Sequence, residues 1–578
     1  MNGGEVIGEV LARNGVQAVF TLCGGHISPI LVGADKHGVR IVDVRDEASA
    51  VFAADAAGRM TGIPGVAAVT AGPGVTNTVT AVQNAMMAES PVLIFGGATA
   101  TVLKGRGSLQ DIDQMAFMKP ITKWATTIKH YKSLGPTVQK AFDVAREGKP
   151  GPVFIEVPID LLYPEETVRE WYAKEAGGGK GLGAKAISLY LDAHLTKQFK
   201  APHMGLDLPA PAVRERLAGD IDRQVAKVAK ALASAKKPAL VIGSQAMVNF
   251  TPAQADELAA AVTALGLPTW LGGTARGLLG RHSDIQFRHK RSDALREADV
   301  VIVAGFPFDF RLGYGMKINR KSTLVSANLD PVALKKNRKP EIAVLGHPGE
   351  FLRKLAVQAP SQSRDDWFDG IREREAARDA QIAARAEGEG ELVNPVRFFT
   401  RMEEKMGDNA VLVVDGGDFV ATGAYVLRPR QPLNWLDPGV FGTLGVGGGF
   451  AVGAALSRPE SEVWLIWGDG SSAYSLAEFD TCVRHGFAPI AVIGTDASWG
   501  QIARDQVEIL GTTLGCDLLR TEYHKVAEGY GGVGILVTRD EDIDAALDAA
   551  KKHASEGRPV CINLHLRKSD FRKGSISM

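Results

Sequence analysis

The chain has few cysteines and no excess of positive or negative charge, and both features exclude some classes of function. The four cysteines, Cys23, Cys482, Cys516 and Cys561, form no CxxC or CxxxC pair. We therefore expect neither a disulfide framework nor a structural zinc site, and we expect a reducing, cytoplasmic compartment. The 66 Lys and Arg residues equal the 66 Asp and Glu residues, so no overall basic field is available for a nucleic acid or an anionic membrane.

The sequence also lacks long hydrophobic runs free of glycine and proline. Residues 60–88 and 438–457 are uncharged, but the first stretch contains Pro64 and Pro73 and the second contains seven glycines. Such stretches suit close backbone packing better than a lipid-facing helix. The first 15 residues carry acidic side chains and no apolar core, so they do not indicate a signal peptide. We expect no membrane segment.

Glycine is present in excess, at 65 of 578 residues, or about 11% against a usual share of roughly 7%. Around these glycines, apolar runs alternate with helical patterns, beginning with AVFTLCGG and RIVDVRDE. This rhythm predicts an α/β fold of three doubly wound parallel-sheet domains. The expected divisions are a first domain at 1–165, a linker at 166–215, a central domain at 216–357, a charged helical connector at 358–393, a third domain at 394–566 and a polar, basic tail at 567–578.

The motif WLIWGDG places Asp469 at the end of a predicted strand, and Asp496 ends the next strand, 27 positions later. One βαβ crossover brings both carboxylates to the carboxyl edge of a sheet, where ligands of such folds bind. Two oxygen ligands suit Mg²⁺, which fills its other positions with phosphate oxygens and water. Gly470 would let the backbone approach a diphosphate, and the Ser471 N–H would face its charge. The alternative is a tight GDG turn with an unrelated aspartate later.

Three further segments stand at strand ends. Glu47 lies where a strand passes into an Ala-rich helix, so it is either an N-terminal helix charge or a partly desolvated acid. VTAGPGVTN, residues 69–77, places Pro73 between two glycines, and by itself could be only a turn. FGTLGVGGGFAVG, residues 441–453, leaves bare backbone on both sides of Leu444.

Together, GDG with its second ligand, RDE, GPG-x-TN and GTLG resemble the motifs of thiamine diphosphate enzymes of the acetolactate synthase type. Within that group, GGHISPIL, RGSLQDIDQ and the ending SDFRKGSIS look like the acetolactate synthase-like 2-hydroxyacyl-CoA lyases, a branch with an animal protein and bacterial relatives. The resemblance spans nearly the whole chain. It implies pyrimidine-binding, central and diphosphate-binding domains in that order.

The resemblance also implies roles for individual residues. Glu47 would hydrogen-bond the aminopyrimidine of the cofactor and so promote loss of the thiazolium proton. Asp469, Asp496 and the carbonyl of Ser498 would hold Mg²⁺. Other cofactor contacts are expected at Pro73, Asn77, Gly417, Asp418, Gly442, Leu444, Gly468, Gly470 and Ser471.

Two departures from the family pattern are visible in the sequence. The usual asparagine metal ligand is Asp496 here, and its extra negative charge should tighten the demand for a divalent cation. No His-His pair occurs among the twelve histidines, which argues against a mechanism of the pyruvate decarboxylase type.

The candidates for substrate handling and catalysis are His26, Gln110, Trp499 and Gln501. His26 could exchange a proton near neutral pH, or it could be a loop histidine that caps the next helix. Gln110 matches a glutamine of the synthases, and otherwise it is an exposed loop amide. Trp499 and Gln501 follow the second metal ligand, although a packing role for Trp499 is an equal alternative.

The central domain carries a second set of candidates, Arg276, Arg311, Asn328 and Asp330. Relatives bind FAD or ADP with these elements, since Arg suits phosphates and Asn or Asp after a strand suits ribose hydroxyls. We favour ADP or an empty site over FAD, and the alternative is that these residues are structural remnants. The tail residues Arg567, Lys568, Arg572 and Lys573 would either meet CoA phosphates or form a frayed terminus.

The resemblance implies a thiamine diphosphate- and Mg²⁺-dependent lyase that splits 2-hydroxyacyl-CoA into formyl-CoA and an aldehyde or ketone, with the reverse condensation also possible. Its ligands would be acyl-CoA and small carbonyl compounds. The rival readings are acetolactate synthase, which joins two 2-oxo acids, and a non-catalytic partner protein with the same fold. The family cofactor lies between the first domain of one chain and the third of another, so we expect a homodimer or homotetramer.

Overall fold

The computed structural model describes residues 1–175, 182–199, 221–360 and 362–572. The chain divides into two compact units, Met1–Gly58 with Ile63–Arg214, and Arg59–Gly62 with Glu215–Met578. All four cysteines are free thiols, and only Cys23 is exposed. None of the helices in the described ranges is both long and apolar enough to cross a membrane.

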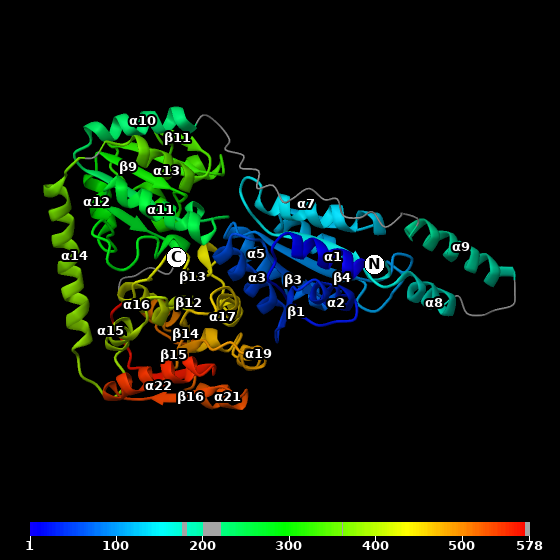
Figure 1. The fold of residues 1–578 in the computed structure, drawn as a ribbon. Helices are drawn as coiled ribbons and strands as arrows, with labels where there is room; N and C mark the ends of the chain where they lie inside the picture. Colours follow the sequence, from blue (N-terminus) through cyan, green and yellow to red (C-terminus); the bar gives the residue numbers. More distant parts are fainter. Residues whose placement is uncertain (176–181, 200–220, 361, 573–578) are drawn as a thin grey trace. The chain divides into compact units, whose positions relative to one another are not determined.

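The first unit is built on a six-stranded, all-parallel sheet in the order β2-β1-β3-β4-β6-β5, and Figure 1 shows helices such as α1 and α7 packed beside it. Strands β3, β4 and β6 are buried along their whole length, as apolar strands with helices on both faces are. The strands are β1 (Ala18–Leu22), β2 (Arg40–Asp43), β3 (Gly65–Val69), β4 (Val92–Ala98), β5 (Trp124–Thr127) and β6 (Val153–Pro158). The helices are α1 (Gly3–Arg13), α2 (Ser28–Lys36), α3 (Glu47–Thr61), α4 (Pro73–Thr76), α5 (Val79–Met87), α6 (Gln114–Met118) and α7 (Leu134–Arg146).

Glycine lets two helices of this unit touch backbone to backbone. A Cβ added to Gly8 of α1 would lie 2.2 Å from the carbonyl oxygen of Gly33 in α2, and one added to Gly33 would lie 2.1 Å from that of Gly4. Part of the glycine excess therefore serves helix packing.

The expected linker contains two helices, α8 (Glu165–Glu175) and α9 (Leu182–Phe199). Val168 and Tyr172 of α8 form a small buried cluster with Leu195 of α9. Residues 176–181 and 200–215 of the expected linker lie outside the described residues.

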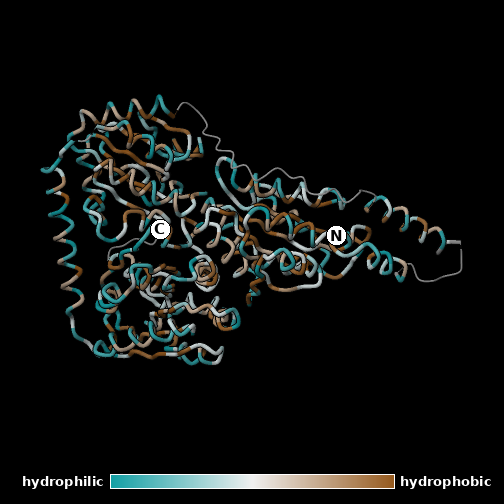
Figure 2. Tube along the Cα trace, viewed as in Figure 1, coloured by the Kyte–Doolittle hydropathy of each residue, from teal (hydrophilic) through white to brown (hydrophobic). Residues whose placement is uncertain are grey.

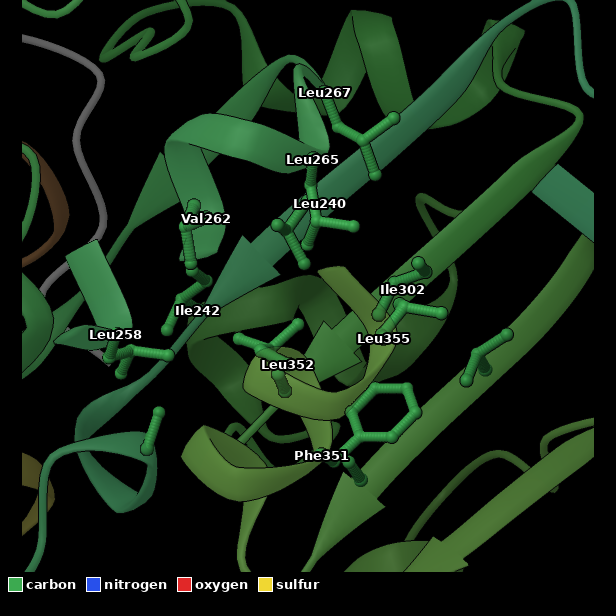
Figure 3. Close-up of a cluster of buried hydrophobic side chains, with 14 of the residues drawn as sticks. Leu240, Ile242, Leu258, Val262, Leu265, Leu267, Ile302, Phe351, Leu352 and Leu355 are labelled. Carbon is green, nitrogen blue, oxygen red and sulfur yellow. The ribbon is translucent and has the colours of Figure 1, made fainter. Parts of the chain in front are cut away.

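The central domain has a five-stranded parallel sheet in the order β11-β10-β9-β7-β8. Leucine, isoleucine and valine side chains from the sheet and from α11 and α13 fill its core (Figure 3). The strands are β7 (Pro238–Ile242), β8 (Thr269–Leu271), β9 (Val300–Ala304), β10 (Thr323–Asn328) and β11 (Ile342–Leu345), and the helices are α10 (Ile221–Ser234), α11 (Pro252–Leu265), α12 (Arg291–Glu297) and α13 (Pro348–Gln358).

The expected helical connector is α14 (Asp365–Ala386), which is largely hydrophilic in Figure 2. Its ends are nevertheless buried. Trp367, Phe368 and Ile371 join a core cluster of the central domain, whereas Ile382 and Ala386 join the core of the third domain.

The third domain repeats the topology of the first. Its parallel sheet has the order β13-β12-β14-β15-β17-β16. The strands are β12 (Val411–Asp415), β13 (Trp435–Leu436), β14 (Val463–Gly468), β15 (Ile490–Thr495), β16 (Val533–Val537) and β17 (Val560–His565). The helices are α15 (Pro395–Lys405), α16 (Asp418–Val426), α17 (Val446–Ser457), α18 (Asp469–Ser472), α19 (Glu478–His485), α20 (Gly500–Leu510), α21 (Tyr523–Gly529) and α22 (Ile543–Ser555).

The predicted fold class is confirmed, since all three sheets are parallel and flanked by helices. In the first and third sheets the strand order reverses at corresponding places, between β1 and β3 and between β12 and β14. A crevice outside the carboxyl ends of the strands opens at such a reversal, and ligands of doubly wound folds bind there. The candidates His26, Pro73, Asn77, Gly417, Asp418, Asp469, Gly470 and Ser471 follow these four strands, whereas Glu47, Gln110 and Asp496 follow neighbouring strands.

Candidate active site

In the first domain, Glu47 begins α3 and is 7% exposed. Its Oε2 accepts a hydrogen bond from Asn77 Nδ2 at 3.0 Å. Its Oε1 lies 3.5 Å from the position that a Cβ on Gly74 would occupy. Asn77 therefore fixes one carboxylate oxygen, and the other oxygen faces a glycine.

The GPG turn holds this arrangement in place. Gly72 has a φ of +61°, and a Cβ there would lie 2.9 Å from both Cβ and O of Gln110, so a side chain is excluded twice. The Gly72 N–H donates to Oε1 of the buried Gln114 at 2.9 Å, and Gln114 Nε2 donates in turn to Gly97 O at 3.0 Å. Pro73 then begins α4. The turn is thereby tied to the neighbouring strand β4.

His26 and Gln110 meet at a residue that the sequence analysis missed, Thr70. His26 Nδ1 lies 3.3 Å from Thr70 Oγ1, and Thr70 Oγ1 donates to Gln110 Oε1 at 3.5 Å. Thr70 follows β3, and a Cβ on Gly74 would lie 2.8 Å from Thr70 Cγ2. Its place beside the GPG motif was the available signal. Burial lowers the pKa of His26, so the imidazole is neutral at neutral pH.

In the third domain, Asp469 and Asp496 lie at the ends of adjacent strands, β14 and β15. Asp469 Oδ1 accepts from the Gly470 N–H and its Oδ2 from the Ala497 N–H, both at 2.9 Å. Asp496 Oδ1 accepts from the Ser498 N–H at 3.1 Å. Ala497 has a φ of +59°, a left-handed conformation that few non-glycine residues adopt. This strained turn connects the two carboxylates.

The two carboxylates carry a charge that the described residues leave poorly compensated. Burial raises the pKa of Asp469 to about 6. Burial, with the repulsion of the Asp469 carboxylate, raises the pKa of Asp496 to about 7. A divalent cation would relieve both effects, so the donor set fits Mg²⁺. No group of three or more His, Cys, Asp or Glu side chains that could hold a metal ion is found in the described ranges.

Trp499 and Gln501 pack against glycines of the same edge. A Cβ on Gly470 would lie 2.4 Å from the Trp499 ring, and a Cβ on Gly417 would lie 3.1 Å from Gln501 Oε1. The structure thus gives Trp499 a packing contact over the GDG turn. Both side chains lie beside the segments predicted to hold a diphosphate.

Asp415 at the end of β12 is a second residue that the sequence analysis missed. Its fully buried carboxylate accepts from the N–H groups of Gly445 and Gly447 and from Trp467 Nε1. Burial raises its pKa to about 6, although these donors act in the opposite direction. A charged residue directly before the GG of VVDGGDF was the signal.

Asp415 anchors the glycine-rich segment, which begins with Gly442 and Leu444. Gly442 has a φ of +66° and open space where its Cβ would be. Leu444 is half-buried. A Cβ on Gly447 would lie 2.1 Å from Trp467 Nε1, so this part of the bare backbone is required by packing within the domain.

Two other predicted contacts are engaged within the chain. Asp418 forms ion pairs with Arg504 and, at 4.0 Å, with Arg572 of the tail. The Ser471 hydroxyl donates to Asp415 O at 2.8 Å and to Gly468 O at 3.0 Å. Lys573 and the residues after it lie outside the described ranges.

The central-domain candidates are spread over several strand ends. Arg276 lies over the Trp435 ring at 4.7 Å, and Arg311 forms an ion pair with Asp309 at 2.6 Å. Asn328 and Asp330 accept hydrogen bonds from nearby backbone N–H groups. Arg291, which the sequence analysis did not select, donates to Arg311 O, and burial and then Arg276 and Arg311 lower its pKa. Three arginines therefore share one positive region.

Comparison with known proteins agrees with this geometry. Residues 1–117, 225–355 and 415–564 match the N-terminal, central and C-terminal domains of thiamine pyrophosphate enzymes. The chain is 48% identical over 586 residues to 2-hydroxyacyl-CoA lyase 2 of Danio rerio and 44% identical over 590 residues to that of Homo sapiens, covering 100% of this chain and 93% and 92% of those proteins. A probable acetolactate synthase of Mycobacterium bovis is 31% identical, over 98% of this chain and 95% of that protein.

The resemblance seen in the motifs is thus confirmed along the whole chain, and the two buried carboxylate sites lie within the matched N-terminal and C-terminal domains. The chain belongs to the thiamine diphosphate-dependent enzymes and is a homologue of 2-hydroxyacyl-CoA lyase 2.

Proposed function

We propose that the chain is a Mg²⁺-dependent 2-hydroxyacyl-CoA lyase, which cleaves a 2-hydroxyacyl-CoA into formyl-CoA and an aldehyde or ketone. The observation that carries this proposal is the similarity at 44–48% identity, over the full chain, to proteins named 2-hydroxyacyl-CoA lyase 2. In the reaction the C1–C2 bond breaks, the C2 hydroxyl loses its proton as the carbonyl forms, and C1 takes up a proton. The reverse condensation uses the same groups.

The first and the third domain would each bind a different part of the cofactor, as the family resemblance implies. Asp469, Asp496 and the carbonyl of Ser498 would bind the cation, and the bare backbone at Gly417 and Gly470 would admit a diphosphate. Thiamine diphosphate supplies a nucleophilic carbon that attaches to carbonyl groups. Glu47 would exchange a proton with the cofactor's pyrimidine at Oε1, because Asn77 occupies Oε2.

His26 is the proposed base for the C2 hydroxyl. Its Nδ1 faces Thr70, and its Nε2 has no partner among the described residues. A neutral imidazole can accept a proton at Nε2 at neutral pH, and the lowered pKa of His26 favours that form. Gln110, held by the same Thr70, would bind a polar substrate group.

We propose that two chains are needed for one complete site, as the family resemblance implies, and hence that the protein is a homodimer or homotetramer. Helix α20 supports this, because none of its residues is buried and Ile502, Ile509 and Leu510 are exposed. Sedimentation analysis of an active sample should give at least a dimer. An active monomer would contradict the proposal.

The central domain is proposed to bind ADP. Arg276, Arg291 and Arg311 form a positive region that suits a diphosphate, and Asn328 and Asp330 follow β10, where ribose hydroxyls are bound in such folds. We also propose a reducing, cytoplasmic compartment, which the four free thiols support. Mass spectrometry of small molecules released from the purified protein tests the nucleotide, and cell fractionation tests the compartment.

Acetolactate synthase remains the second candidate, because a probable acetolactate synthase is 31% identical over 98% of the chain. The two activities separate in one assay, in which the protein with thiamine diphosphate and Mg²⁺ receives either 2-hydroxyacyl-CoA or pyruvate. Formyl-CoA or formate from the first substrate supports the lyase. Acetolactate from pyruvate without formyl-CoA would overturn it, and no product from either would favour a non-catalytic partner protein.

A further inference from the structure

A cavity of about 360 Å³ lies in the first unit, at the carboxyl ends of β4, β5 and β6. Its walls include Pro158 and Thr127, the last residues of β6 and β5, and Thr101, just after β4. Helix α9 forms another wall with His194, Lys197 and Gln198. The switch point between β1 and β3 lies elsewhere along the same sheet, so this cavity is separate from the strand ends that carry His26 and Thr70.

Three lysines line this cavity. Lys104 pairs with the buried Glu156 at 2.6 Å. Lys129 and Lys197 have no ion-pair partner in the part of the chain that the structure describes, and both are exposed at the cavity. Two uncompensated ammonium groups at the rim favour an anion and disfavour a metal ion.

The cavity wall also contains an unsatisfied acceptor. Gln198 is 5% exposed, and its Oε1 has no hydrogen-bond partner in the described structure. Its Nε2 donates to Thr101 Oγ1 at 2.8 Å and lies 3.1 Å from His194 Nε2. Thr101 is fixed in turn by the buried Asp160. A buried acceptor without a partner costs free energy, and a ligand with a hydroxyl or amide N–H would satisfy it.

The ligand must therefore combine an anionic group for Lys129 and Lys197 with a hydrogen-bond donor for Gln198. A phosphate ester that carries hydroxyl or amide groups has both. Inorganic phosphate has the anionic group but no separate hydroxyl or amide that could reach Gln198 while the phosphate contacts the lysines. The volume falls within the usual range of small-molecule sites, roughly 300–1,000 Å³.

We propose that this cavity binds the phosphorylated part of a nucleotide, either the CoA portion of the substrate or a free adenine nucleotide. The CoA source rests on the proposed lyase function, whereas nucleotide binding by the cavity does not.

Calorimetric titration of the full-length protein tests the proposal, with CoA, adenosine 3′,5′-bisphosphate, ADP and inorganic phosphate as separate probes. The double variant Lys129→Ala/Lys197→Ala should bind CoA, or ADP at a second site beside the one proposed in the central domain, about tenfold more weakly or worse, since each lost charge-assisted contact weakens binding severalfold. The matched control Lys119→Ala/Lys174→Ala removes the same charge from exposed positions outside the cavity and should leave the affinities unchanged. Gln198→Leu should weaken CoA or ADP but not inorganic phosphate.

The pattern among the probes identifies the source. Weaker binding of CoA and the bisphosphate, with ADP unaffected, assigns the cavity to the substrate, and weaker binding of ADP as well assigns it to nucleotides in general. Equal affinities in all variants, or no binding of any probe, would overturn the proposal. Circular dichroism without ligand verifies that each variant is folded. Since the titration needs no turnover, a protein that binds nucleotide here but makes no formyl-CoA would refute the lyase and leave the cavity site intact.

Discussion

The first and third domains have the same strand order but opposite chemistry at the same place. At its switch point and the adjacent strand end, the first sheet presents Glu47 hydrogen-bonded to the neutral Asn77, and Thr70 in contact with His26. The third presents several carboxylates, of which Asp415, Asp469 and Asp496 have raised pKa values. The strand order thus determines where a ligand binds, and the residues that follow each strand determine which kind of ligand binds there. One edge suits a neutral heterocycle, and the other suits a cation with an anionic diphosphate.

The comparison predicts that no other group of the first domain can replace the Glu47 carboxylate. Glu47→Gln keeps the shape of the side chain but removes the acid, and its hydrogen-bond partner Asn77 is neutral. We expect formyl-CoA production to fall by about 10²–10⁴-fold, the usual worth of a positioned acid or base. The exposed Glu170→Gln is the control and should keep full activity. Unchanged turnover in Glu47→Gln would remove the catalytic role of this residue.

In the third domain, loss of a carboxylate should raise the Mg²⁺ concentration that cofactor binding requires. Asp469→Ala or Asp496→Ala should weaken Mg²⁺-dependent cofactor binding by about 10²-fold or more, because an oxygen ligand is lost. Asp496→Asn keeps an oxygen ligand while removing the repulsion from Asp469, and its effect should be smaller. Titration with Mg²⁺, followed by tryptophan fluorescence, measures the change.

Asp548→Ala on α22 removes an exposed carboxylate of the same domain and serves as the control. If Asp469→Ala bound the cofactor as tightly as the wild type, and did so without Mg²⁺, the assignment of the metal ligands would be refuted.

Much of the fold followed from the sequence, because continuous apolar strands buried on both faces leave few alternatives to a parallel sheet between helices. The repeat of the first domain in the third was visible for the same reason. What local patterns did not indicate was packing at a distance. No motif indicated that Gly8 and Gly33 lie where two helices touch, and the charged connector α14 buries both of its ends.

The site was predictable where a motif joins a strand end to a charged residue, as at Glu47, Asp469 and Asp496. Thr70 and Asp415 were missed because their importance comes from contacts across the sheet. Thr70 contacts His26 and Gln110, which are 44 and 40 positions away, and Asp415 accepts from Gly445, Gly447 and Trp467. Arg504 was missed for the same reason, since its ion pair with Asp418 spans 86 positions.

The contrast between the domains also predicts a pH dependence of stability from Asp415. Its folded pKa is about 6, above the ordinary 3.8, so the folded state binds the proton more tightly than the unfolded state. The contribution of Asp415 is therefore fully present below pH 4 and is lost as the pH rises through 6, by up to about 3 kcal/mol for a shift of this size.

The side chain at this position cannot titrate in the variant Asp415→Asn, so the variant lacks this loss of stability. Its free energy of unfolding relative to that of the wild type should therefore rise by a few kcal/mol between pH 4.5 and pH 7.5. Denaturant unfolding of the metal-free protein at the two pH values measures this difference. The exposed Asp548→Asn should show no such trend. A constant gap between the wild type and Asp415→Asn would contradict the raised pKa.

The smallest predicted effect concerns the neutral cluster around Thr70. A Cβ on Gly24 would lie 2.4 Å from Thr70 Cβ, whereas a Cβ on the adjacent Gly25 would have nothing within 4 Å. Gly24→Ala should therefore displace Thr70 from His26 and Gln110 and cost about 1–3 kcal/mol of stability, as overpacking does, with a moderate fall in kcat/KM. Gly25→Ala is the matched control and should be nearly neutral. Thermal unfolding and lyase assays of both variants measure the contrast, and equal behaviour of the two would show that the contacts of Thr70 do not organise this edge of the first sheet.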